Sequence, residues 1–174
     1  RLLKALYGCV KSALLWYQLY TGHLKGLGFE LNPYDPCVAN CLINGSQCTI
    51  TWYVDSTKIS HTNPKVVTRI IDTLEVEFGK ITLRSGQEHT FLGMKIKYEE
   101  NRTAVITMNE YLKEAITESG LEVKQRATSP AKRNLFNVDQ AAPLLSEIEA
   151  NRFHSVTAKL LYDATRARMD ILLP

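Results

Sequence analysis

The sequence predicts an α+β fold with an antiparallel sheet and packed helices, and three observations lead to this class. Segments rich in β-branched and aromatic residues follow one another directly, with helical segments between the groups of strands. Several stretches show the apolar spacing of amphipathic helices. With 45% hydrophobic and 22% charged residues, a chain of 174 residues has the composition of a globular protein that buries a core.

The first helix is expected from Ser12 to Lys25, where apolar residues recur at helical spacing. Gly26 and Gly28 follow it as a stop signal. Residues 31–36, LNPYDP, are expected to form a turn-rich link because their two prolines exclude a helix.

Three short strands are then expected to meander through residues 37–60. Asn44-Gly45 lies between apolar and β-branched residues. Asparagine and glycine both tolerate the positive φ of a tight hairpin turn. A second reversal is expected at Asp55-Ser56, before the strand TKIS. An aspartate there is explained by its turn propensity alone, or alternatively by a role as a magnesium ligand.

The clearest helix follows, capped by Thr62 or Asn63, with Pro64 in its first turn and Gly79 at its end. HTFLGMKIKYEE and TAVITMN are expected to be two strands joined by a polar loop at 99–102. The apolar stripe expected on the helix consists of Val67, Ile70, Ile71, Leu74 and Phe78.

A third helix is expected to start at Asn109, which would cap it, and to end at Gly120. Residues 121–145 contain two prolines and mixed polar residues, so they are expected to be a connecting segment. A final helix should run from about Ser146 to Arg166. Its expected apolar positions are Ile148, Phe153, Val156, Leu160 and Leu161.

The bulk properties exclude several classes. No apolar run approaches the ~20 residues of a membrane-spanning helix, and the first residues lack the features of a signal peptide, so we expect an intracellular protein, cytoplasmic or nuclear, that is not secreted. The four cysteines lack the paired spacing of a zinc site, so free thiols are expected rather than a metal site on Cys37, Cys41 and His61. Basic residues cluster before Glu30 and again at Lys124, Arg126, Lys132 and Arg133, either as phosphate-facing surfaces or as solvated faces.

YVDS at 53–56 and three longer blocks of the sequence resemble motifs of the copia-type reverse transcriptases that long-terminal-repeat retrotransposons encode. YVDS at 53–56 resembles the family's YVDD hairpin, and LLKALYGCVKSALLWY at 2–17 resembles its LxKALYGLKQSPRLWY segment. FGKITLRSGQEHTFLGMKI at 78–96 resembles the stretch that ends in FLGxxI. AKLLYDATRARMDI at 158–171 resembles the LLYxxxxTRPDI segment that precedes the ribonuclease H domain.

This resemblance implies part of a right-hand polymerase palm over residues 1–120. It also implies a connecting segment and helix over 121–174, leading toward a ribonuclease H domain that the chain lacks. The implied partners are an RNA or DNA primer–template and other parts of a Pol polyprotein, and the implied cofactor is Mg²⁺.

The resemblance also assigns roles to individual residues. Asp55 takes the place of the first hairpin aspartate, which is catalytic and a metal ligand in the family. Phe91 and Leu92 are equally well explained as core residues, and Trp16 is expected in the core rather than as a stacking platform. The residues matched to nucleic-acid-binding positions are Tyr53, Val54, Gly8, Lys11, Ser12, Phe91, Leu92 and Gly93.

Departures from the family pattern predict lost catalysis. Ser56 stands where the family has its second hairpin aspartate, and a hydroxyl carries no charge to hold Mg²⁺. The family's other metal-binding aspartate lies upstream of the first block, where this chain begins. We therefore expect a degenerate polymerase fragment that is inactive alone, or alternatively a nucleic-acid-binding module or a structural remnant of the same fold.

Overall fold

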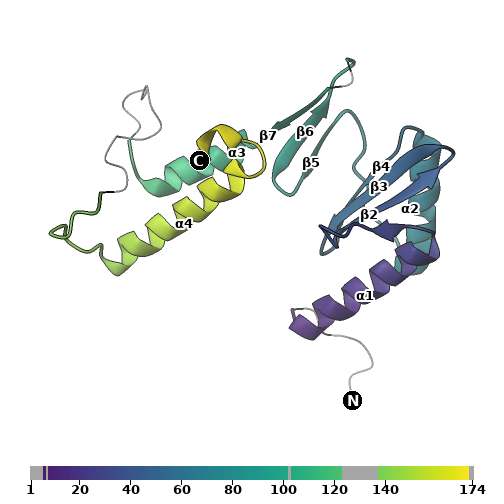
Figure 1. Cartoon of the computed structure of the whole chain (residues 1–174), viewed down its shortest axis with the longest axis horizontal. Helices are drawn as coiled ribbons and strands as arrows, with labels where there is room; N and C mark the ends of the chain where they lie inside the picture. Colours follow the sequence, from purple (N-terminus) through teal and green to yellow (C-terminus); the bar gives the residue numbers. More distant parts are fainter. Residues whose placement is uncertain (1–5, 7, 102, 123–136, 173–174) are drawn as a thin grey trace. The chain divides into compact units, whose positions relative to one another are not determined.

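The computed structural model describes residue 6 and residues 8–101, 103–122 and 137–172. They form two compact units, residues 1–84 and 85–174, each with its own antiparallel sheet and helices (Figure 1). The α+β class is therefore confirmed. None of the described helices has the length and apolar character needed to cross a bilayer. The expected polymerase regions, divided at residue 120, and the palm identity of the sheet stay predictions.

Unit 1 contains two helices and a four-stranded sheet in the order β1-β2-β3-β4, with every neighbouring pair antiparallel. The predicted helices and the three-strand meander are confirmed. The strand β1 was not expected, because two residues are too few to show an alternating pattern. The elements are α1 (Val10–Gly26), β1 (Glu30–Leu31), β2 (Val38–Ile43), β3 (Ser46–Tyr53), β4 (Ser56–Ser60) and α2 (Pro64–Phe78).

The turn between β2 and β3 has the predicted geometry. Asn44 and Gly45 have φ values of 53° and 76°, so both lie in the left-handed region that this type of hairpin needs. The turn sets the register of the hairpin, with Ile43 opposite Ser46.

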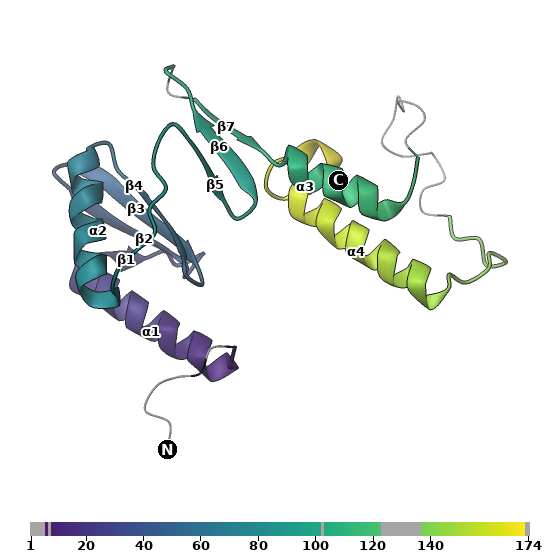
Figure 2. The ribbon, with the colours of Figure 1, turned by 180° about the vertical axis from the view of Figure 1, so that it is seen from behind.

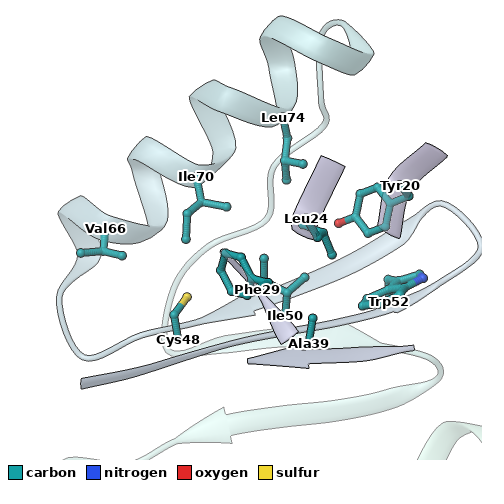
Figure 3. Packing of buried hydrophobic residues seen from close by; sticks show 10 residues of the cluster. All are labelled: Tyr20, Leu24, Phe29, Ala39, Cys48, Ile50, Trp52, Val66, Ile70 and Leu74. Carbon is teal, nitrogen blue, oxygen red and sulfur yellow. The ribbon is translucent and has the colours of Figure 1, made fainter. Parts of the chain in front are cut away.

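The core of unit 1 lies between one face of this sheet and the two helices (Figures 2 and 3). Alternate residues of β3 are buried, as expected for a strand with one covered face. The helix α1 contributes Tyr20 and Leu24, and α2 contributes residues spaced four apart. The buried cluster consists of Tyr20, Leu24, Phe29, Ala39, Cys48, Ile50, Trp52, Val66, Ile70 and Leu74.

The α2 helix begins and ends where its sequence predicts. The Asn63 side chain accepts a hydrogen bond from the Lys65 amide, Pro64 is the first helical residue, and Gly79 follows with φ 86°. The predicted stripe is confirmed at Ile70 and Leu74, which are buried, and at Phe78, which packs against the core cluster. Val67 and Ile71 are only half-buried, and Val66, which was not predicted, is buried instead. The helix packs along the row of residues spaced four apart, and Val67 lies beside that row.

Unit 2 contains three strands where two were predicted. The segment from His89 to Glu100, expected to be one strand, is a hairpin that reverses at Leu92 and Gly93, with φ values of 51° and 78°. A leucine is a poor indicator of a turn, which is why the break was missed. The elements are β5 (Glu88–Phe91), β6 (Met94–Tyr98), β7 (Ala104–Thr107), α3 (Asn109–Ser119), α4 (Glu147–Ala164) and the short 3-10 helix η1 (Met169–Ile171).

The ends of α3 and α4 fit the sequence with one exception. Gly120 ends α3 in the left-handed conformation, and Ser146 with Glu149 forms a capping box at the start of α4. The predicted start at Asn109 is confirmed, but the helix lacks the expected cap: Met108 precedes it, and the Met108 side chain makes no capping hydrogen bond.

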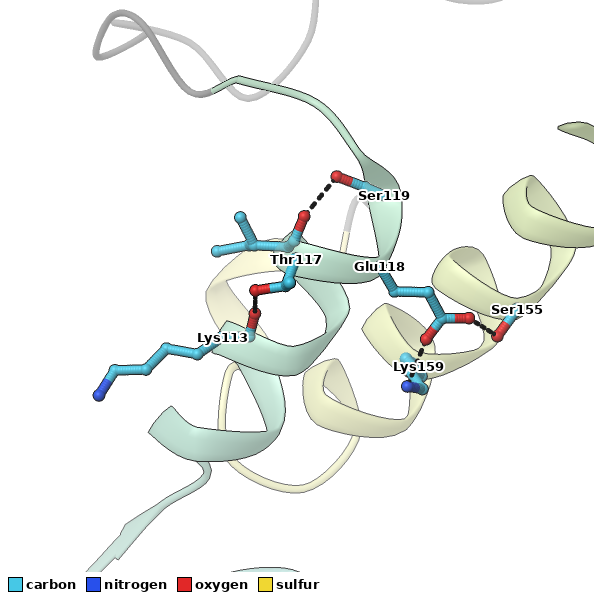
Figure 4. A network of polar contacts seen from close by, with 7 residues as sticks. Lys113, Thr117, Glu118, Ser119, Ser155 and Lys159 are labelled. Carbon is cyan, nitrogen blue, oxygen red and sulfur yellow. Dashed lines mark hydrogen bonds and ion pairs between the residues drawn. The ribbon is translucent and has the colours of Figure 1, made fainter.

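Helices α3 and α4 pack side by side through a polar contact (Figure 4) and through the rings of Tyr111 and Tyr162, whose centroids are 5.4 Å apart. Glu118 of α3 accepts hydrogen bonds from Ser155 and Lys159 of α4. The apolar positions predicted on α4 are largely solvent-facing within the described residues, since Ile148, Phe153, Leu160 and Leu161 are exposed.

Candidate functional site

The candidate site is the turn between β3 and β4. Tyr53 pairs with Ser56, so the turn consists only of Val54 and Asp55. The prediction of a reversal at Asp55-Ser56 is therefore wrong by one residue, and Ser56 is the first residue of β4. The burial of Trp52 fixes this register, because a slip of one residue would move the strand's apolar side chains to the other face.

Two aromatic residues of α1 hold the turn. The Trp16 indole Nε1–H donates a hydrogen bond of 2.7 Å to the carbonyl oxygen of Val54. The Tyr20 hydroxyl shares a hydrogen bond of 3.0 Å with Thr57 Oγ1, just beyond the turn. The Trp16 ring also stacks on Tyr20, with ring centroids 5.5 Å apart, so the prediction that Trp16 packs against the core is confirmed.

The turn backbone is strained. Val54 has φ 54°, which is unfavourable for a β-branched residue. The energetic cost of such a conformation is on the order of 1–3 kcal/mol. Such a residue persists only where its surroundings fix it. The contacts from α1 fulfil this role, because one reaches the Val54 carbonyl inside the turn and the other reaches Thr57, the second residue of β4. Burial raises the pKa of the Tyr20 hydroxyl, so this group stays a neutral hydrogen-bonding partner at physiological pH.

The chemistry available at the turn is limited to exposed oxygen atoms. Asp55 and Ser56 are both exposed, so a carboxylate and a hydroxyl face solvent at the tip of the sheet. Together they offer a hydrated divalent cation only one charged ligand. Across the part of the chain that the structure describes, no group of three or more His, Cys, Asp or Glu side chains converges to hold a metal ion.

The other predicted site residues of unit 1 lie on two elements. Tyr53 is exposed on the face of the sheet opposite the core, next to Asp55. Gly8, Lys11 and Ser12 lie at the start of α1, where the Ser12 hydroxyl donates a hydrogen bond to the Leu6 carbonyl.

The matched residues of unit 2 form a second anchored turn. Leu92 and Gly93 are the two turn residues of the β5–β6 hairpin, and Phe91 ends β5. The Tyr162 hydroxyl of α4 donates a hydrogen bond of 2.9 Å to the Leu92 carbonyl. Gly93 has φ 78°, a conformation that residues with a side chain rarely adopt, which accounts for a glycine there.

Sequence reasoning missed the anchoring roles of Trp16, Tyr20 and Tyr162. For Trp16 and Tyr162 the available signal was an aromatic side chain with a polar tip inside a matched block, LLWY and LLY, whereas Tyr20 lies three residues beyond the first block. The second basic cluster, from Lys124 to Arg133, lies outside the described residues.

The chain is similar to retrotransposon proteins of the yeast Saccharomyces cerevisiae. It is 24% identical over 169 residues to a transposon Ty5-1 protein, and the match covers 97% of this chain and 54% of that protein. It is 25% identical over 185 residues to the Gag-Pol polyproteins of transposons Ty1-MR1 and Ty1-BL, covering 99% of this chain and 10% of each polyprotein.

The chain thus spans about half the length of one of these relatives and a tenth of the others. No family model and no solved structure matches it. Along nearly its whole length, the chain is distantly similar to copia-type retrotransposon Gag-Pol polyproteins.

Proposed function

We propose that this chain corresponds to the reverse transcriptase part of a retrotransposon Pol polyprotein, and that on its own it binds primer–template nucleic acid without extending it. The observation that carries the proposal is the YVDS hairpin, whose two-residue turn presents Asp55 to solvent while α1 fixes the backbone beside it. The similarity to Gag-Pol polyproteins along the chain supports the same assignment.

The lack of polymerisation follows from the ligands at the turn. Two-metal phosphoryl transfer uses a pair of divalent ions about 3.5–4 Å apart, which converging acids must hold. The turn supplies one carboxylate, Asp55, and Ser56 provides an uncharged hydroxyl at the start of β4. The described residues therefore do not fit a two-ion Mg²⁺ site.

The exposed face of the unit 1 sheet supports nucleic-acid binding. The strands β2, β3 and β4 contain no Asp or Glu, so their part of this face carries no carboxylate that would repel phosphates; the acid of this face is Glu30 of the edge strand β1, opposite Asn40. It carries amide and hydroxyl groups that already bond to one another: Gln47 donates to Asn40 and Thr49, and Thr49 donates to Asn40 at 2.8 Å. Lys58, on the same face, is a cation that can contact phosphate.

A primer-extension assay combined with a binding titration tests the proposal. The full chain should show no extension in Mg²⁺ or Mn²⁺, and its binding to a labelled primer–template should weaken steeply with salt because phosphate contacts release counterions. Lys58→Gln should weaken binding and reduce the salt dependence, whereas Lys65→Gln, which removes the same charge from an exposed position of α2, serves as the matched control. Mg²⁺-dependent extension of the primer, or a binding affinity that does not change with salt concentration, would contradict the proposal.

A Ser56→Asp variant tests the stated cause of inactivity. A second carboxylate beside Asp55 should raise the Mn²⁺ affinity of the turn by about tenfold, because adjacent charged oxygens attract the cation more strongly. The readout is Mn²⁺-induced broadening of the Thr57 amide signal in NMR spectra. Ser60→Asp at the other end of β4 is the control, and equal broadening in both variants would show that the turn is not the metal-binding position.

A further inference from the structure

Two of the four cysteines face each other across the β2–β3 hairpin. Cys41 and Cys48 are direct partners in the strand register. Both belong to the core face of the sheet, since Cys48 is fully buried in the core cluster and Cys41 packs against that cluster. Figure 3 shows the Cys48 side chain on the core side of the strand, below α2.

The register sets the separation of the two residues. Ile43 and Ser46 close the two-residue turn, and hydrogen-bonded and non-hydrogen-bonded pairs alternate from there. Cys41 and Cys48 are two pairs further along, so they form a hydrogen-bonded pair with Cα atoms about 5.5 Å apart. Disulfides span Cα separations of roughly 4.4–6.8 Å, so the two backbones lie within bonding range. The Cβ atoms of a hydrogen-bonded pair are about 5.5 Å apart, wider than the roughly 3.5–4.5 Å of a relaxed disulfide, so the strands must draw together slightly and the bond is strained and easily reduced.

No other pair of cysteines meets this condition. Cys37 lies four residues before Cys41 in the same extended segment, opposite Trp52, which donates its amide hydrogen to the Cys37 carbonyl. At about 3.3 Å per residue, this places Cys37 about 13 Å from Cys41 and too far from Cys48. Cys9 is exposed and precedes α1.

We propose that Cys41 and Cys48 form a redox modification site, which a peroxide converts from two thiols to an intramolecular disulfide. Cys41 is half-exposed and reacts first: its sulfur attacks the peroxide, the O–O bond breaks, and a sulfenic acid and one water are formed. The Cys48 sulfur then displaces the sulfenic hydroxyl, which leaves as a second water with the Cys48 proton. Two thiols and one hydrogen peroxide thus give one disulfide and two waters.

Burial and the neighbouring Cys41 sulfur raise the pKa of the Cys48 thiol. A raised pKa lowers the thiolate fraction of Cys48 and so slows the second step, because the thiolate is the attacking form. The disulfide would join β2 to β3, the strand that leads to Asp55. Its formation does not depend on the proposed binding of nucleic acid.

A chemical cleavage site between the two cysteines allows the disulfide to be detected. Its single Asn-Gly sequence, Asn44-Gly45, lies between the two cysteines, and hydroxylamine cleaves the peptide bond of that dipeptide. The full chain is treated with hydrogen peroxide, its remaining thiols are alkylated, and the denatured protein is cleaved without reductant. Fragments 1–44 and 45–174 should remain covalently linked, and dithiothreitol should separate them.

Matched variants identify the bond. A Cys9→Ser/Cys37→Ser variant, which keeps only the facing pair, should give linked fragments to the same extent as the unsubstituted chain. A Cys9→Ser/Cys41→Ala variant, which keeps Cys37 and Cys48, should give separate fragments, with far-UV circular dichroism confirming that it folds. Separate fragments from the unsubstituted chain, or linkage that survives in the second variant, would overturn the proposal.

Discussion

The two units stabilise themselves in different ways. Unit 1 encloses a cluster of ten buried apolar residues between its sheet and two helices. Among its described residues, unit 2 buries Ile96, Met108, Ala115 and Ala164, together with the carboxylate of Asp163. Because burial of apolar surface is the dominant favourable term in folding, unit 1 is expected to be the more stable of the two. Unit 2 depends more on polar contacts such as those of Glu118.

The same comparison extends to the two hairpin tips. In both, the first turn residue is apolar with positive φ, and its carbonyl accepts a hydrogen bond from an aromatic side chain of a helix: Trp16 to Val54 and Tyr162 to Leu92. The second position differs, since Gly93 has positive φ without steric cost whereas Asp55 does not occupy that region. A tip without glycine therefore relies more heavily on its anchoring bond.

The largest expected effect is the loss of a core side chain from unit 1. Leu24→Ala should destabilise this unit by about 3–4 kcal/mol, because Leu24 is fully buried and its removal leaves a cavity. The measurement is a denaturant titration combined with hydrogen exchange of the β3 amides. Leu42→Ala, with a side chain that is 76% exposed, is the control. A similar loss in both variants would show that the ten-residue cluster does not dominate the stability of unit 1.

A smaller effect is expected when the anchor of the unit 1 tip is removed. Trp16→Phe keeps an aromatic ring but loses the donor to Val54, and it should cost about 1–1.5 kcal/mol. Tyr17→Phe removes a longer hydrogen bond of 3.2 Å, to Pro36, from the same helix and should cost less. Thermal denaturation of both variants provides the comparison.

A double-mutant cycle shows whether the anchor and the strained turn are coupled. Val54→Gly removes the energetic cost of the positive φ at this position. The loss of stability caused by Trp16→Phe should therefore be smaller in the Val54→Gly background. Strictly additive effects would mean that the indole bond does not hold the turn in its conformation. Tyr162→Phe, in contrast, should leave the hydrogen-exchange protection of unit 1 unchanged, because its bond to Leu92 lies in unit 2.

In unit 2, one substitution is expected to increase the stability of the protein instead of lowering it. Burial raises the pKa of Asp163, whose two carboxylate oxygens have no hydrogen-bond partner among the described residues. A raised pKa in the folded state means that this carboxylate favours folding at acidic pH and opposes it as the pH rises through that pKa. Asp163→Asn should therefore stabilise the protein by about 1 kcal/mol at neutral pH and have a vanishing effect in acid.

Asp170 provides the matched control for Asp163. The hydrogen bond from Arg168 lowers the pKa of Asp170, so its contribution to stability is present above its ordinary pKa of 3.8 and is lost as the pH falls. Asp170→Asn should thus destabilise at neutral pH, and melting temperatures between pH 3 and pH 7 should diverge in opposite directions for the two variants. Parallel curves would exclude a charge effect at Asp163.

The sequence predicts those parts of the structure whose causes are local. The α2 helix has its cap, its first proline, its apolar stripe and its terminal glycine within one segment, and the Asn44-Gly45 turn is specified by two residues. Asp55 at a hairpin tip is confirmed for the same reason. The one-residue error at Ser56 arises because both Asp and Ser favour turns, while the packing of Trp52 decides the register.

The anchoring bonds could not be predicted because they are not local. The bond from Trp16 to Val54 joins residues 38 apart, and that from Tyr162 to Leu92 joins residues 70 apart. Propensity would not place Val54 or Leu92 at positive φ, because the conformation is unfavourable for both. The positive φ at each position is explained by the tertiary hydrogen bond that its carbonyl accepts.

The smallest expected effect concerns the polar contact between α3 and α4. The hydrogen bond from Lys159, and then that from Ser155, lowers the pKa of Glu118 below its ordinary value of 4.5. The stabilising contribution is therefore present above pH 4.5 and is lost as the pH falls through the lower folded-state value. Glu118→Gln should slightly lower the melting temperature at pH 7, and the difference should disappear in acid.

Glu110→Gln is the control for this contact, since it removes a pair with Lys113 that is exposed at both ends and lies within α3 alone. Exposed pairs of this kind contribute little because solvent and salt screen them. If Glu118→Gln also proves silent at pH 7, the polar contact does not hold the two helices together. Their association would then rest on apolar contacts such as that between the Tyr111 and Tyr162 rings, and unit 2 would depend on apolar packing as unit 1 does.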